Sequence, residues 1–230
     1  SNPVYRVLHP ALCSADLVRA FEALQSTFQT CSDRGDLHSP VDAILRGQYE
    51  HEDGIGFGGR REEWSNHILR QIVVDHLSSA EAVAFIDWHT GIGAFAEAVP
   101  LCFHDRESEA VKALREWHRS DVTAYAGQFL GGVAPQFTGL LVKALEQMMS
   151  PRRLYAVVVE FGTKANGDVI RALMIDRWLR YFGRQQSATA VRMREEIAEC
   201  FCPSDARWWD AVRPRAGQIV SRTLEGLASL

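Results

Sequence analysis

The sequence predicts an α/β fold, and three observations lead to this prediction. The segment "RLYAVVVEFGT" (residues 153–163) is a continuous run rich in β-branched residues, which is typical of a central strand buried on both faces. A second apolar run, "AVAFID" (residues 82–87), follows closely on a segment with helical periodicity. Helical patterns fill most of the remaining chain. We therefore expect a mostly parallel or mixed sheet that is flanked by helices.

The first half of the chain supplies two helices and two loops to this scheme. Residues 14–28 carry apolar side chains on one helical stripe, and Ser14 can cap the start of that helix. The polar segment 30–42 contains Gly and Pro and predicts a loop. Residues 47–66 contain five glycines without a regular period, which predicts a second, longer loop. A helix from residue 65 then leads towards the first strand.

The second half of the chain supplies one more strand candidate and several helices. The segment "PLCFH" (residues 100–104) predicts a short edge strand. Two clear strands and this third one make a small sheet, so we expect the sheet to be incomplete. The spacing of apolar residues predicts further helices at residues 107–125, 138–149, 168–182, 188–200 and 206–227.

Composition bounds the class of protein. The chain has 230 residues, of which 47% are hydrophobic and 23% charged, and these values suit one globular domain over residues 1–230. The net charge of −4 gives no reason to expect a nucleic-acid partner, which requires a basic surface. No apolar stretch approaches the ~20 residues of a membrane span, and no signal-peptide pattern opens the chain, so we expect no membrane contact.

The cysteines indicate a reducing compartment. Five are present, an odd number, and no CxxC spacing occurs, which disfavours a disulfide framework or a cysteine-based zinc site. We therefore expect reduced thiols and a cytoplasmic location.

Polar side chains follow both strongly predicted strands at the point where each strand ends. Asp87 and His89 close the first strand, and Glu160 lies near the end of the second. Ligands of open α/β sheets bind outside the carboxyl ends of the strands, which makes His89 and Glu160 candidate site residues. The alternatives are that His89 is an ordinary turn residue and that Glu160 is satisfied by nearby backbone or an arginine.

A set of motifs resembles the zinc metallocarboxypeptidase superfamily, most closely an uncharacterised branch near the succinylglutamate desuccinylases and aspartoacylases. These motifs are "DWHTGIG" and "VVVEFGT", together with "NPVYRVLHPAL", "GQYEHEDGIGFGG", "EEWSN" and "DRWLRYFG". The resemblance implies an α/β/α fold and one catalytic zinc, held by an upstream H-x-x-E motif and by a later histidine. It assigns His89 as the later metal ligand and Glu160 as the general base. Asp87 is then a candidate to orient His89, with a purely structural hydrogen bond as the alternative.

The sequence departs from this pattern at the upstream metal motif. No H-x-x-E precedes His89, and the one match, from His104 to Glu107, follows it and is interpreted as a solvated turn. We therefore expect the chain to be the C-terminal part of a longer metallohydrolase, with a natural short form that has lost the metal site as the alternative. Zn²⁺ is expected in the complete protein and not bound specifically to this chain, because one imidazole is a poor zinc site.

The function implied by the resemblance is hydrolysis of an amide or peptide bond in a small-molecule or peptide substrate. We expect the isolated chain to be inactive. The alternative is a non-catalytic binding or assembly domain that keeps the fold without the metal. An incomplete sheet also exposes an edge, so we expect self-association of the isolated chain.

The glycine-rich loop at residues 47–66 supplies the remaining substrate-binding candidates. Arg60, Arg61, Trp64 and Asn66 can hold an anionic or amide substrate. The alternative is a surface loop with a solvated arginine pair.

Overall fold

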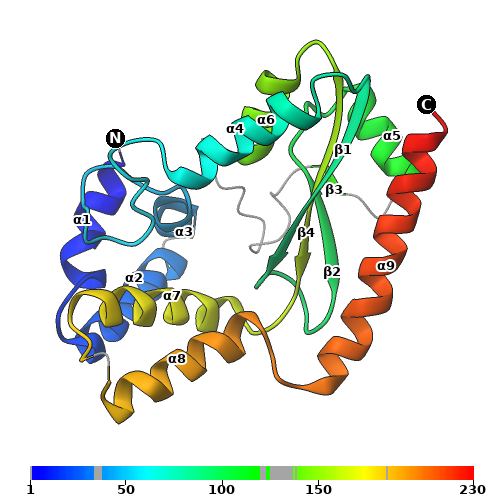
Figure 1. The fold of residues 1–230 in the computed structure, drawn as a ribbon. Helices are drawn as coiled ribbons and strands as arrows, with labels where there is room; N and C mark the ends of the chain where they lie inside the picture. The colour runs from blue at the N-terminus through cyan, green and yellow to red at the C-terminus, as the bar shows by residue number, and fades with distance from the viewer. Residues whose placement is uncertain (1, 34–37, 120–122, 125–136, 138, 185) are drawn as a thin grey trace. The chain divides into compact units, whose positions relative to one another are not determined.

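The structure, a computed structural model, describes residues 2–33, 38–119, 123–124, 137, 139–184 and 186–230 (Figure 1). The chain forms two compact units. Unit 1 is built mainly from Ser1–Arg60 and Lys164–Pro203, and unit 2 mainly from Arg61–Ala126, Gly139–Thr163 and Ser204–Leu230. Two compact units can belong to one folded domain, so the single domain over residues 1–230 stays a prediction.

Apart from the glycine-rich segment, the described residues of unit 1 are mainly helical. Its first helix begins where Asn2 accepts a hydrogen bond from the Tyr5 backbone N–H, and the proline at the first helical position fits that start. Its core contains Tyr5, Leu24, Ile44 and Met174. The helices are α1 (Pro3–Leu12), α2 (Leu17–Asp33), α3 (His38–Leu45), α7 (Asn166–Tyr181) and α8 (Ala188–Phe201).

A buried arginine fixes the part of the glycine-rich loop that belongs to unit 1. Arg177 of α7 is 6% exposed and donates to the Asp53 carboxylate at 2.6 Å and to the Cys13 carbonyl at 2.7 Å. The same carboxylate lies 2.9 Å from the Nε2 atom of His9 in α1. A buried guanidinium requires such partners, so this loop is ordered by packing and hydrogen bonds rather than by regular secondary structure.

Unit 2 contains the sheet, which has the strand order β1-β4-β2-β3 (Figure 1). Strand β4 pairs in parallel with β1 on one side and antiparallel with β2 on the other. The strands are β1 (Ala82–Thr90), β2 (Ala98–Cys102), β3 (Thr123–Ala124) and β4 (Arg153–Phe161), and the helices are α4 (Trp64–His76), α5 (Glu109–Trp117), α6 (Leu141–Met149) and α9 (Ala206–Ala228).

One hydrophobic core of unit 2 lies on the face of β4 that carries its odd-numbered side chains. Tyr155, Val157, Val159 and Phe161 pack with residues of α5 and α9, including Trp208. Helix α6 also contacts β4, and α4 packs against α6, on the other side of the sheet from α5 and α9 (Figure 1). The strand period of two residues therefore turns Glu160 away from this core, towards the opposite face.

The α/β fold class is confirmed, with a mixed sheet. Strand β4 is central, as predicted, and all of its residues from Leu154 to Phe161 are buried. The prediction of an edge strand at residues 100–104 is wrong in its position, because β2 lies between β4 and β3. Residues 82–87 of β1 are only partly buried, because β1 is the edge strand among the described strands.

Several predicted boundaries also differ. The loop predicted at residues 30–42 is wrong at both ends, because α2 continues to Asp33 and α3 begins at His38, while residues 34–37 lie outside the described part. The helix predicted at 107–125 ends at Trp117, and residue 125 is not among the described residues. The predicted start of α6 at residue 138 likewise lies outside them. Among the described residues, no helix combines the length and apolarity needed to cross a membrane.

Candidate functional site at the ends of strands β1 and β4

The pairing of β1 with β4 brings the two predicted site residues together. The strands run parallel, and His89 lies directly opposite Glu160 in the register. Because side chains of one strand face alternate sides, Asp87 and His89 share a face of β1. Glu160 therefore meets Asp87 and His89 at one end of the sheet, although it is far from them in the sequence.

The imidazole of His89 lies between two carboxylates. Its Nε2 atom is 3.2 Å from Oδ2 of Asp87, and its Nδ1 atom is 3.5 Å from Oε1 of Glu160. The exposed fractions of these side chains decrease from 47% for His89 through 25% for Asp87 to 9% for Glu160. The cluster thus extends from solvent at the histidine to the interior at the glutamate.

This environment favours the charged form of His89. The pKa of His89 is raised to about 9, chiefly by its hydrogen-bonding interaction with Glu160, with a further contribution from the charge of Asp87. Partial burial opposes the shift, because it disfavours the imidazolium ion. In the described structure, the preferred form at neutral pH is an imidazolium that bridges two carboxylates.

Two polar atoms near the end of β4 lack partners among the described residues. Oε2 of Glu160 and Oγ1 of Thr163 are both buried and accept or donate no hydrogen bond there. Glu160 is 7% exposed and Thr163 is 3% exposed. A buried polar group without a partner costs about 1–3 kcal/mol, so this end of the sheet is not optimised for stability alone.

The segment that follows His89 is bonded to the segment that follows Glu160. The N–H of Gly91 donates to the carbonyl of Phe161 at 3.0 Å, and the N–H of Ala96 donates to the carbonyl of Gly162 at 2.8 Å. The same Gly162 carbonyl accepts a 2.8 Å hydrogen bond from the indole N–H of the buried Trp208. These bonds couple the positions of the two strand ends.

Gly162 is required for this close approach. A Cβ atom at this position would lie 1.9 Å from the carbonyl oxygen of Ala94, which is a backbone atom that cannot swing away. The glycine in the motif "EFGT" is therefore explained by the passage of residues 91–97 across the end of β4.

The interpretation of the H-x-x-E match at His104–Glu107 as a solvated turn is wrong for its first residue, His104. Its side chain is only 4% exposed, and its Nδ1 atom lies 2.5 Å from Oε1 of Glu146 in α6. Its Nε2 atom accepts a 2.8 Å hydrogen bond from the N–H of Ala156. Glu107 is exposed and takes no part in this arrangement. Sequence spacing could not reveal Glu146, because it follows His104 by 42 residues.

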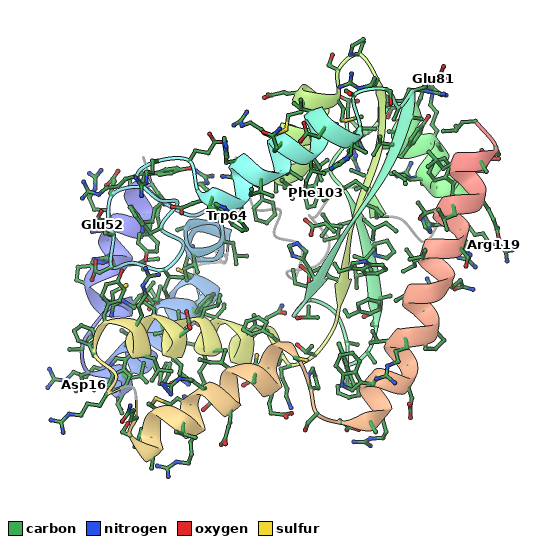
Figure 2. The ribbon with its side chains drawn as sticks, viewed as in Figure 1. Asp16, Glu52, Trp64, Glu81, Phe103 and Arg119 are labelled. Atoms are coloured by element: carbon green, nitrogen blue, oxygen red, sulfur yellow. The ribbon has the colours of Figure 1, made fainter. Side chains whose placement is uncertain are left out.

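The four substrate-binding candidates from the glycine-rich loop do not contribute to the contacts that define the site. Arg60 forms an ion pair with Glu52, and both side chains are more than half exposed. Trp64 begins α4 and is 76% exposed (Figure 2). Arg61 and Asn66 are exposed as well. Their role in substrate binding stays a prediction.

The described residues do not by themselves fit a zinc site. A catalytic zinc takes three protein ligands and one open position. No group of three or more His, Cys, Asp or Glu side chains in the described part of the chain is arranged to hold a metal. Both ring nitrogens of His89 also face carboxylates. A zinc ion bound at His89 would therefore need additional ligands and a deprotonated imidazole.

The fold and the site define an α/β protein with a histidine–carboxylate cluster at the end of two parallel strands. The chain belongs to the family described as "Protein of unknown function (DUF2817)", which it matches over residues 1–215. No curated protein and no solved structure matches it. The family description assigns no activity, so the relation to zinc metallocarboxypeptidases stays a prediction.

Proposed function

We propose that the chain supplies the acid–base part of a zinc-dependent hydrolase that cleaves an amide or peptide bond. The observation that carries this proposal is the buried Glu160 carboxylate, which has one oxygen directed at His89 and the other without a partner among the described residues. The site lies at the carboxyl ends of two parallel strands, where α/β proteins bind ligands.

Glu160 is the general base in this proposal. It takes a proton from the attacking water as the water oxygen bonds to the carbonyl carbon. It returns a proton to the leaving amine as the C–N bond breaks. Asp87 holds the His89 ring in orientation through Nε2.

His89 is the residue of this chain that would hold the metal. When bound, zinc would supply the Lewis acidity that polarises the amide carbonyl. The remaining ligands would come from outside the described residues, since these contain no suitable group of three. For the chain of 230 residues alone, we expect weak zinc binding, with a dissociation constant larger than about 1 µM in a calorimetric titration. Tight stoichiometric binding that disappears in His89→Ala would contradict this expectation.

The decisive test uses the full-length protein. Release of amine from a panel of N-acyl amino acids and short peptides is measured together with zinc content. Glu160→Gln should lower turnover about 10²–10⁴-fold with zinc retained, because the amide cannot act as a base. His89→Ala should lower the zinc content. Glu81→Gln, at the other end of β1 (Figure 2), is the matched control and should change neither value.

The same experiment distinguishes the alternative function. A non-catalytic binding or assembly domain would show no hydrolysis. Its Glu160→Gln variant would be more stable than the wild type and otherwise unchanged. Unchanged turnover in Glu160→Gln would refute the role of this residue as the base.

A further inference from the structure

The loop between β1 and β2, residues 91–97, crosses the carboxyl end of β4 (Figure 1). We call it the crossing loop. It must cross there because β1 and β2 pair with opposite edges of β4. Backbone hydrogen bonds from its Gly91 and Ala96 reach Phe161 and Gly162, the two residues that follow Glu160.

Glu97 closes this loop with both its backbone and its side chain. Its carbonyl accepts a 2.9 Å hydrogen bond from the N–H of Gly162, and its Oε2 atom accepts a 2.8 Å hydrogen bond from the N–H of Ala94. Ala94 is the residue whose carbonyl lies against Gly162. Glu97 therefore binds Gly162 directly through its carbonyl. Through its side chain it also binds Ala94, the loop residue that lies against Gly162.

The backbone conformation of the crossing loop needs such a restraint. Gly93 has φ of 112°, and Ala96 has φ of 62°, an uncommon value for a residue with a side chain. Conformations of this kind persist where the surroundings hold them. The carboxylate of Glu97 is the side chain that supplies a hydrogen bond within the loop.

We infer that Glu97 is a positioning residue of the site: through the crossing loop it fixes the placement of His89 relative to Glu160. This role rests on the function proposed above, since positioning affects turnover only if the two side chains act together. Glu97 is itself exposed, so its contribution to global stability is small. The residue can thus be changed without unfolding the protein.

The test of positioning is spectroscopic and needs no enzymatic activity. The ¹⁵N resonances of the His89 ring report its contacts with Asp87 and Glu160, and they are recorded at one fixed neutral pH after assignment with His89→Gln. Glu97→Ala should shift both resonances. Glu97→Gln should restore them, because its amide oxygen can still accept from the Ala94 N–H. Glu81→Ala is the matched control and should leave them in place.

Two results would overturn the inference. One is that Glu97→Ala, like the control Glu81→Ala, leaves the His89 resonances at their wild-type positions. The other is a Glu97→Gln variant that is as perturbed as Glu97→Ala. Urea unfolding of each variant, with an expected unchanged midpoint, separates positioning from a general loss of structure.

Activity provides the second arm, in the protein with every residue that its gene encodes. There, Glu97→Ala should lower kcat about ten-fold and leave KM unchanged, because a small misplacement of reacting groups slows the chemical step. A wild-type protein without hydrolytic activity would refute the proposed function, while shifted His89 resonances would still support the positioning role. An active protein in which Glu97→Ala keeps its full kcat would overturn the inference.

Discussion

Two histidine–carboxylate pairs lie along strand β4, and they differ in nearly every physical property. His104 is buried against the middle of the strand, where it accepts from the Ala156 N–H and faces Glu146. His89 is half exposed at the carboxyl end, where it faces Glu160 and Asp87. The first histidine has one donor and one acceptor as neighbours, and the second has two carboxylates.

This difference sets the charge of each ring. Because Nε2 of His104 accepts from a backbone N–H, Nδ1 must carry the proton that is donated to Glu146, and the ring is neutral. Burial lowers the pKa of His104 more than Glu146 raises it. The carboxylates around His89 instead raise its pKa to about 9, led by Glu160. His104 is thus a satisfied, neutral histidine within the fold, whereas His89 is a charged histidine near buried polar atoms that have no partner among the described residues, which makes its surroundings the candidate site.

The largest expected effect comes from removing the structural histidine. His104→Ala should lower the free energy of unfolding by about 3 kcal/mol, because it leaves the Ala156 N–H unpaired and opens a cavity. His89→Ala should cost about 1 kcal/mol, since the ring is half exposed. Urea unfolding followed by circular dichroism measures both values. Equal decreases in the free energy of unfolding for the two variants would contradict the distinction between a structural His104 and a weakly stabilising His89.

The same asymmetry explains how much of the site could be predicted from the sequence. His89 and Glu160 were identifiable because each follows an apolar run, and parallel strands place their ends together. His104 could not be interpreted correctly, because its partner Glu146 belongs to a distant helix. The spacing to Glu107 suggested a local pair that the structure does not form. Local sequence patterns indicate where strands end. They do not indicate a hydrogen-bond partner that tertiary packing brings from a distant part of the chain.

The fold shows the same division. The continuous apolar run of β4 predicted a central strand correctly. A similar apolar run in β1 lies at the edge of the described sheet and is only partly buried, so apolar composition does not encode how many neighbours a strand receives. Helix α1 had no counterpart among the predicted elements, although Asn2 as the cap and Pro3 at the first position are recognisable start signals. Glu97 also escaped prediction, since its role depends on the loop crossing β4.

The pH dependence of stability should have two limbs of opposite sign. His104 has a lowered pKa, so the unfolded state binds the proton first and stability falls as pH decreases below 6.5. His89 has a raised pKa, so its contribution is complete below 6.5 and is lost as pH rises towards about 9. After allowance for solvent screening, the alkaline limb is worth about 1 kcal/mol.

Urea midpoints between about pH 5 and about pH 9 measure both limbs. The variant His89→Gln should flatten the alkaline limb and leave the acid limb unchanged. Stability that increases from neutral pH towards pH 9 in the wild-type protein would contradict the assignment of His89 as an imidazolium.

Thr163→Val should sharpen the contrast between the candidate site at the end of the sheet and the structural core. The buried Thr163 hydroxyl has no partner among the described residues, so its replacement by an isosteric methyl group should raise the free energy of unfolding by about 1 kcal/mol. Thr223→Val is the matched control. The Thr223 hydroxyl is equally buried but donates to the Ile219 carbonyl at 2.8 Å, so this variant should lose a similar amount. A loss in both variants would show that Thr163 is satisfied.

The smallest expected effect on stability belongs to Asp87. Asp87→Asn should change the free energy of unfolding by only a few tenths of a kcal/mol, because its pair with His89 is partly exposed and screened by water. It should nevertheless lower the pKa of His89, since the charge of Asp87 is one cause of the raised value. NMR titration of the His89 ring measures this shift independently of unfolding.

Glu160→Gln is the matched comparison for Asp87→Asn and should lower the pKa of His89 further. Asp87 lies closer to the ring, at 3.2 Å against 3.5 Å, but water screens its more exposed carboxylate. The hydrogen-bonding interaction with Glu160 is nevertheless the largest cause of the raised pKa, so Glu160 dominates although the charge of Asp87 contributes more than the charge of Glu160. If Asp87→Asn instead gives the larger decrease in pKa, the charge of Asp87 outweighs this interaction, and Asp87 rather than Glu160 is the main partner of His89.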